Sequence, residues 1–119
     1  MKRLLSLVGV VLLAAITVAT VARAHSSEAA TTIVRVSGKE YKFTLSRSPR
    51  PRGAFSFRFK NVGHIAHDFK IAGKKTPLLQ PGKSATLNVR IAKAGRYRYI
   101  CTVPGHATLG MKGPSGSSA

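Results

Sequence analysis

The stretch AFSFRFK, residues 54–60, alternates strictly between apolar and polar side chains. Its three phenylalanines, Phe55, Phe57 and Phe59, fall on one side of an extended chain, because successive side chains of a β-strand point to opposite faces of a sheet. A helix would instead need an apolar period of 3.6 residues. The stretch therefore predicts a strand with one face in the core and the other in solvent.

The same period of two recurs on both sides of this stretch, and it predicts further strands over residues 31–37, 40–46, 84–91 and 96–102. A turn is predicted at residues 37–39. The proline-rich segment 46–53 is expected to be a loop, since a central strand does not tolerate such residues. Beyond the N-terminal segment, no stretch has a helical period. The sequence predicts an all-β protein, a Greek-key β-sandwich of about seven or eight strands.

The N-terminal segment has the pattern of an export signal. Lys2 and Arg3 precede an apolar and small-residue run over residues 4–21, and Ala-Arg-Ala follows at residues 22–24. A basic start, an apolar run and an A-x-A site predict a cleaved signal peptide over residues 1–24. An uncleaved membrane anchor is the alternative, because the run approaches the roughly 20 residues that span a bilayer. Either reading predicts an extracytoplasmic domain: periplasmic, at the cell surface or secreted.

The remaining chain is expected to hold one small domain over residues 31–112, between a flexible leader (25–30) and a flexible tail (113–119). Cys101 is the only cysteine, so the domain has no internal disulfide. An unpaired thiol in an exported protein pairs between molecules, stays oxidisable or binds a metal ion.

The chain is strongly basic, with 20 Lys and Arg against three acids and a formal net charge of +17. Removal of Lys2, Arg3 and Arg23 with the signal peptide leaves 17 basic residues and a charge of +14. Such a field attracts acidic protein patches and anionic membrane or cell-wall surfaces. The basic residues alternate along predicted strands, as Arg58 and Lys60 do, which also suits a solubilising outer face. They form no motif for specific nucleic-acid binding.

The stretch CTVPGHATLGM, residues 101–111, places Cys101, His106 and Met111 five positions apart in turn. A thiolate, an imidazole and a thioether are soft ligands that select copper, and copper electron-transfer sites use two His and one Cys with a weak Met. The loop supplies all of these except one histidine. Met111 could instead fill a gap in the core.

His67 is the candidate for the missing histidine. It shares the inward side of its segment with Phe69 and Ile71, whereas His64 falls in a turn and is expected to be exposed. A satisfied core histidine is the alternative for His67, but the Cys/His/Met loop favours ligation.

Three segments together resemble a known family: NVGxxxHDF at residues 61–69, PGKSAxL at 81–87 and GxYxYxCTVPGHxxxGM at 95–111. They are similar to the cupredoxins, small type 1 blue copper proteins. The ligand loop resembles the longer loops of auracyanin and rusticyanin more than that of plastocyanin. The resemblance implies one copper ion, with His67, Cys101 and His106 as trigonal ligands and Met111 as the axial ligand.

The resemblance also implies hydrogen bonds from Asp68 to the ligand loop near Thr102, where many members of the family carry Asn in place of Asp68. It implies a monomeric carrier of single electrons between redox protein partners and no enzyme. Pro104, Ala107 and Leu109 would form an apolar docking patch. A copper carrier or copper-resistance protein of the same fold is the alternative. A Cys–His nucleophile enzyme and a structural β-domain are less consistent with the ligand spacing.

Overall fold

The computed structural model describes residues 9, 11, 14–16, 18–20, 30–49 and 52–114. The predicted signal peptide, leader and tail lie mostly outside these residues, so the division of the chain stays a prediction. Within the described part of the chain, no helix combines the length and apolar character that a membrane crossing needs.

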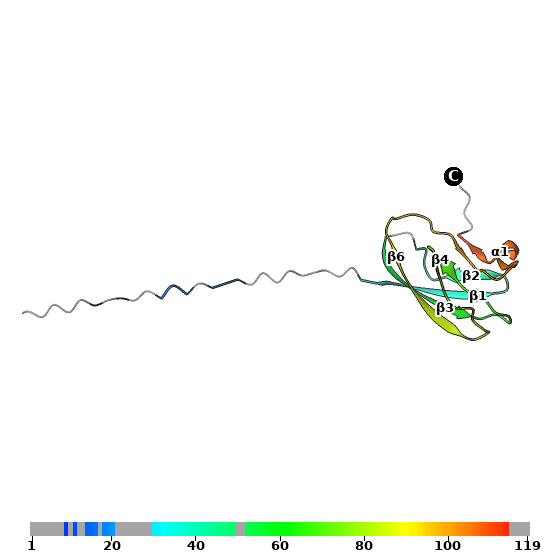
Figure 1. Cartoon of the computed structure of the whole chain (residues 1–119), viewed down its shortest axis with the longest axis horizontal. Coiled ribbons are helices and arrows are strands. Elements are labelled where there is room, and N and C mark those ends of the chain that lie inside the picture. The colour runs from blue at the N-terminus through cyan, green and yellow to red at the C-terminus, as the bar shows by residue number, and fades with distance from the viewer. Residues whose placement is uncertain are drawn as a thin grey trace, which may run out of the picture.

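The described residues form eight strands and one short helix, arranged as two four-stranded sheets (Figure 1). The first sheet has the order β2-β1-β3-β6 and the second β5-β4-β7-β8. The bounds are β1 Thr32–Lys39, β2 Lys42–Leu45, β3 Gly53–Asn61, β4 Lys70–Ile71, β5 Lys74–Lys75, β6 Ser84–Ile91, β7 Tyr99–Ile100, α1 His106–Leu109 and β8 Lys112–Gly113. This architecture confirms the predicted all-β sandwich.

The core lies between the sheets and is built around β3. Phe55, Phe57 and Phe59 are at most 2% exposed and Arg58 and Lys60 are exposed, as predicted, but Ser56 on the outer side is buried. β3 pairs in parallel with β1 and antiparallel with β6, so its phenylalanines sit in the middle of the first sheet. Phe69, directly before β4, packs against Phe57 and Phe59. Burial of each such side chain contributes about 1.5–3 kcal/mol.

The hairpin between β1 and β2 differs from the prediction. β1 continues to Lys39, and the turn falls at Glu40 and Tyr41 rather than at residues 37–39. Gly38 suggested a turn, yet it lies within β1, where a Cβ would come 2.8 Å from the ring of Phe59. The glycine permits a close approach of ring and backbone.

Two further elements differ from the prediction in length or kind. The strand predicted over residues 96–102 is only the two-residue β7. The ligand loop contains α1, a single turn flanked by Gly105 and Gly110, both at positive φ. Four residues are too few to show a helical period, so the pattern did not reveal this helix.

The second sheet brings distant parts of the chain to one place. β4 and β7 pair antiparallel, with Lys70 opposite Ile100, so the segment before β4 lies beside the segment after β7. β7 also pairs with β8, which sets Met111 beside Cys101. In Figure 1 α1 lies at the end of the sandwich away from the start of β1.

Candidate metal centre

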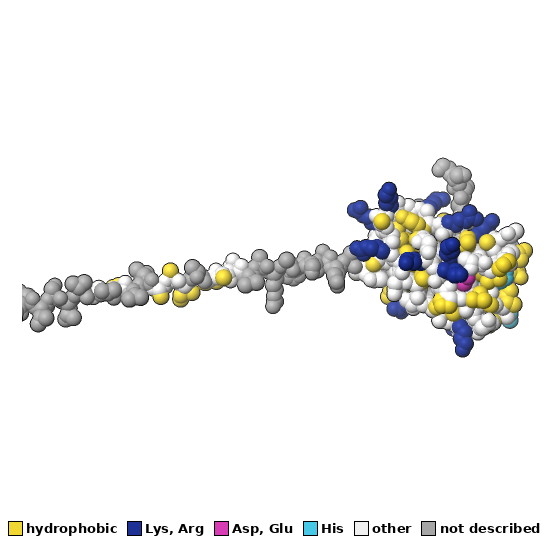
Figure 2. All heavy atoms as spheres, viewed as in Figure 1, with side chains coloured by type: hydrophobic (Ala, Val, Ile, Leu, Met, Phe, Trp, Pro, Cys, Tyr) yellow, Lys and Arg dark blue, Asp and Glu magenta, His cyan; other side chains and the backbone are white. Residues whose placement is uncertain are grey.

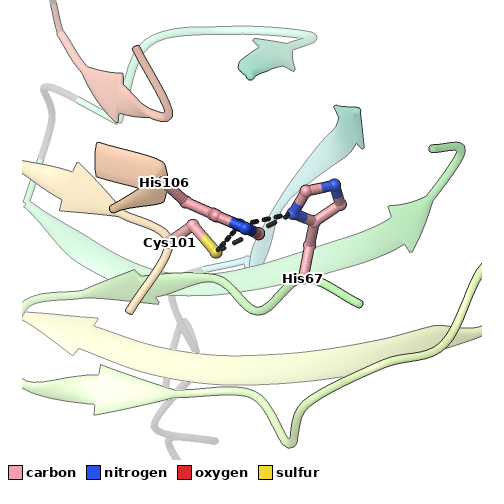
Figure 3. A group of neighbouring side chains, drawn as sticks. All are labelled: His67, Cys101 and His106. Atoms are coloured by element: carbon pink, nitrogen blue, oxygen red, sulfur yellow. Dashed lines mark hydrogen bonds between the residues drawn. The ribbon is translucent and has the colours of Figure 1, made fainter. Parts of the chain in front are cut away.

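Three side chains from the two segments turn toward one another (Figure 3). Nδ1 of His67 lies 3.1 Å from Nδ1 of His106 and 4.0 Å from Sγ of Cys101. Nδ1 of His106 lies 3.6 Å from the same sulfur. All three residues are buried. The structure thus brings together one sulfur and two nitrogen donors, although Cys101 and His106 lie 34 and 39 residues after His67 in the sequence.

These spacings suit one metal ion. Metal–nitrogen bonds of about 2.0–2.1 Å and metal–thiolate bonds of about 2.3 Å, as found for zinc, allow two nitrogens bound to one ion to lie at most about 4 Å apart. Under the same limits a nitrogen and a sulfur lie at most about 4.3 Å apart. The three measured distances all fall below these limits. One thiolate and two imidazoles are the donor types of a copper electron-transfer site.

The ligand loop is closed by its own backbone. The amide of Cys101 donates to the carbonyl of Met111, and the amide of Met111 donates to the carbonyl of His106, both at 3.0 Å. Met111 is fully buried at the end of the loop. Backbone hydrogen bonds therefore tie together the three residues predicted from the loop spacing.

His67 is held by its neighbours in the preceding loop and by Leu79. The backbones of His67 and Leu79 form a bridge of two hydrogen bonds, at 3.0 and 2.8 Å. Asn61, fully buried, donates through its side-chain amide to the carbonyls of Ile65 and Leu79. The side chain of His64 is 95% exposed, as predicted.

Asp68 links the two segments of the site. Its Oδ1 accepts a hydrogen bond of 2.6 Å from the amide of Thr102, and its Oδ2 accepts one from the Thr102 hydroxyl. Asp68 is 3% exposed although it alternates with the inward-facing His67 and Phe69. His67, Asp68 and Phe69 are thus all buried. Asp68 can be buried because its carboxylate is hydrogen-bonded to Thr102 of the ligand loop.

Glu40 is the site residue that the sequence reasoning missed. Its Oε1 lies 2.8 Å from Nε2 of His67 and accepts hydrogen bonds from the amides of His64 and Ile65. Burial raises the pKa of Glu40, but the hydrogen bonds from His67 and the two amides outweigh this effect and lower it to about 2. The only signal in the sequence was its rarity, as one of three acids in the chain.

Burial shifts the pKa values of Cys101 and His106 in opposite directions. Burial raises the pKa of the Cys101 thiol, so the metal-free sulfur stays protonated at neutral pH. Burial lowers the pKa of His106, and the neighbouring His67 lowers it further, so this imidazole stays neutral and available as a ligand. The ring of Tyr41 packs edge-on against His106 at 5.2 Å between centroids.

Comparison with known proteins identifies the family. The cupredoxin-like domain family matches residues 10–111 of the chain. The structure resembles the auracyanin of Roseiflexus castenholzii with a TM-score of 0.58 and 22% identity, over 71% of this chain and 94% of that one. It resembles auracyanin A of Chloroflexus aurantiacus, described as a "blue" copper protein, with a TM-score of 0.56 and 22% identity, over 71% and 96% of the two chains.

A sequence match to auracyanin-B of Chloroflexus aurantiacus is 47% identical over 38 residues. The matched segment covers 32% of this chain and 16% of the length of that relative. The chain belongs to the cupredoxin-like domain family, because the family match covers most of its length. Its buried donor set fits one type 1 copper ion in both ligand type and spacing.

Proposed function

We propose that this protein is a type 1 blue copper protein that carries single electrons between redox partners. The observation that carries the proposal is the convergence of His67, Cys101 and His106, whose donor atoms lie within 4.8 Å of one another. Met111 is proposed as the axial ligand, since its backbone is bonded to both Cys101 and His106. When bound, copper supplies reversible exchange between Cu(I) and Cu(II).

The residues of the chain provide a rigid, dry site for that exchange. The backbone bonds of the ligand loop and the Asp68–Thr102 contact hold the donors in place, so little has to move when an electron arrives. The exposed fractions are 0% for His67, 1% for Cys101 and 8% for His106. His106 is the most exposed of the three donors, which supports it as the edge where electrons enter and leave.

The surface near this edge supports brief docking of a redox partner. Leu109 is 61% exposed in α1, and Pro104 is exposed in the same loop. Ile65 and Leu78, exposed by 41% and 55%, add apolar surface next to the His67–Leu79 bridge. In Figure 2 the histidine atoms lie among hydrophobic side chains at one edge, while Lys and Arg are spread over the rest of the face. A small apolar patch suits a transient encounter.

The same features argue against enzyme catalysis by a Cys–His pair. A nucleophilic cysteine needs a lowered pKa and access to substrate. Burial instead raises the pKa of Cys101, and its side chain is 1% exposed. Electron transfer requires neither property of the metal-free thiol.

The proposal is tested by visible and electron-spin spectra of the purified protein loaded with copper. We expect an intense blue absorption that survives repeated reduction and oxidation without loss of metal. Cys101→Ser should abolish the colour, while Thr108→Ser, at an exposed position of the same loop, should keep it. A Cys101→Ser protein that stays blue would refute the ligand assignment. Loss of copper during cycling would favour a copper carrier or resistance protein.

Export is proposed on the signal-like pattern of residues 1–24. N-terminal sequencing of the protein made in a host with an export pathway should find the chain starting after Ala24. Intact chains held in the membrane fraction would support the uncleaved anchor instead.

A further inference from the structure

Glu40 stands at the metal centre although it is not among the proposed ligands. One oxygen of its carboxylate, Oε1, lies within hydrogen-bonding distance of three nitrogen atoms. These are Nε2 of His67 at 2.8 Å and the backbone amides of His64 and Ile65 at 2.8 and 3.1 Å. The Glu40 side chain is 23% exposed, whereas that of His67 is fully buried. The buried imidazole of His67 thus has an anionic partner at Nε2, the ring nitrogen that does not face Cys101 and His106.

This contact selects one tautomer of His67. An ionised carboxylate only accepts hydrogen bonds, so Nε2 of His67 has to carry the hydrogen. Nδ1 then keeps its lone pair, and Nδ1 is the atom that lies 4.0 Å from Sγ of Cys101 and 3.1 Å from Nδ1 of His106. A metal ligand has to offer a lone pair. Glu40 therefore turns the coordinating nitrogen of His67 toward the other two donors.

The same oxygen also fixes the loop that carries His67. Its bonds to the amides of His64 and Ile65 join the turn between β1 and β2 to the segment between β3 and β4. Gly63 lies so close that a Cβ at this position would clash with the Glu40 carboxylate. Glu40 therefore holds the loop before β4 in place, and it limits movement of the His67 backbone as well as of the His67 ring.

We propose that Glu40 is a positioning residue for the copper site: it holds His67 in the ligating tautomer and lowers the reduction potential. This inference rests on the proposed role of His67 as a copper ligand. Carboxylate partners of ligating histidines raise the basicity of the ligand, and their loss costs about 10–100-fold in metal affinity. A negative charge bonded to the ligand also favours Cu(II) over Cu(I), because Cu(II) carries the greater positive charge.

Two substitutions separate the hydrogen bond from the charge. Glu40→Gln keeps an acceptor oxygen for His67 and removes the charge, whereas Glu40→Ala removes both. Thr44→Lys is the matched control, because it raises the net charge by one unit, as Glu40→Gln does, at an exposed position of β2. The copper-loaded variants are compared by Cu(II) affinity, visible spectrum and reduction potential. The tautomer of His67 is read from the ¹⁵N shifts of its ring in the copper-free protein.

Glu40→Gln should stay blue and favour Cu(I) by about tenfold more than the control, a rise in potential of about 59 mV for one electron. Glu40→Ala should lose about 10–100-fold in Cu(II) affinity and change its visible spectrum. Copper-free wild type and Glu40→Gln should carry the ring hydrogen of His67 on Nε2, and Glu40→Ala should lose this preference. If Glu40→Ala fails to fold, the potential of Glu40→Gln and the tautomer decide.

A blue wild type whose Glu40 variants match Thr44→Lys in affinity, spectrum and potential would overturn the inference alone. A copper-free wild type with His67 protonated on Nδ1 would overturn it as well. A wild type that gives no blue copper site would refute the proposed function, and with it the role of Glu40 at that site.

Discussion

The backbone contacts of Met111 and the proposed role of its side chain as axial ligand can be separated by mutation. Its backbone closes the ligand loop through bonds to Cys101 and His106, and its side chain is fully buried. The backbone bonds do not depend on the side chain. A side chain of similar volume should therefore leave the loop in place, so that substitution tests the proposed ligation by the thioether alone.

Met111→Leu should keep the blue colour and raise the reduction potential by about 59 mV or more, the equivalent of a tenfold shift between oxidation states. The swap nearly conserves volume and should cost less than about 1.5 kcal/mol in stability. Leu87→Met, at a half-buried position of β6, is the matched control and should leave the potential unchanged. Spectroelectrochemical titration measures both. Equal potentials for Met111→Leu and wild type would remove Met111 from the ligand set.

The residues of the site differ in how much of their role the sequence could reveal. Cys101, His106 and Met111 lie on one loop, so their spacing alone suggested a metal site. His67 was inferred from the inward side of its segment, and the structure does turn it toward Cys101. Glu40 contacts His67 across 27 residues, and no local pattern marks such a contact.

At the scale of elements, the turn at Glu40 and Tyr41 supports both histidines of the site. Glu40 bonds to His67, and Tyr41 packs against His106. The loop after β3 has to come close to this turn, which explains a glycine at position 63: a side chain there would meet the carboxylate of Glu40.

Gly63→Ala should lower the free energy of unfolding by about 1–3 kcal/mol, the typical cost of overpacking. Gly95→Ala is the matched control, because a Cβ at Gly95 meets nothing within 4 Å, and it should change stability by less than about 0.5 kcal/mol. Urea unfolding measures both. The cost of Gly63→Ala should shrink in a Glu40→Ala background. A cost that is equal in both backgrounds would contradict the close contact with Glu40.

The long strands were predictable and the short elements were not. β3 and β6 carry the period of two over eight or nine residues, enough to define an inward face. β7 and α1 have two and four residues, and their conformation depends on pairing with β4 and β8 and on the two flanking glycines. Gly38 misled the prediction because a glycine needed for packing looks the same as one needed for a turn.

At the scale of the whole molecule, charge is distributed unevenly. The chain has three acids, and the two in its described part, Glu40 and Asp68, are both bonded within the site. Among the described residues, no Lys or Arg forms an ion pair with a carboxylate. The positive charge of these side chains is therefore not neutralised by ion pairs and attracts anions that approach the protein.

Electron transfer to a negatively charged oxidant should slow by about tenfold between 10 and 150 mM salt, since salt screens the attraction that speeds the encounter. A positively charged oxidant is the control, and its rate should rise over the same range. Stopped-flow absorption at the blue band measures both rates. Parallel salt dependences for the two oxidants would show that the net charge does not steer the encounter.

The parallel pairing of β1 with β3 and the contact of His67 with Cys101 both join parts of the chain that are distant in the sequence. β1 pairs with β3 although β2 lies between them in the sequence, β3 pairs with β6, and His67 lies 34 residues before Cys101. Contacts between such distant residues form slowly. The complete donor set is therefore available only once this long-range contact has formed. Before folding buries it, Cys101 is an accessible thiol, so the time between synthesis and burial is when oxidation can most readily inactivate the protein.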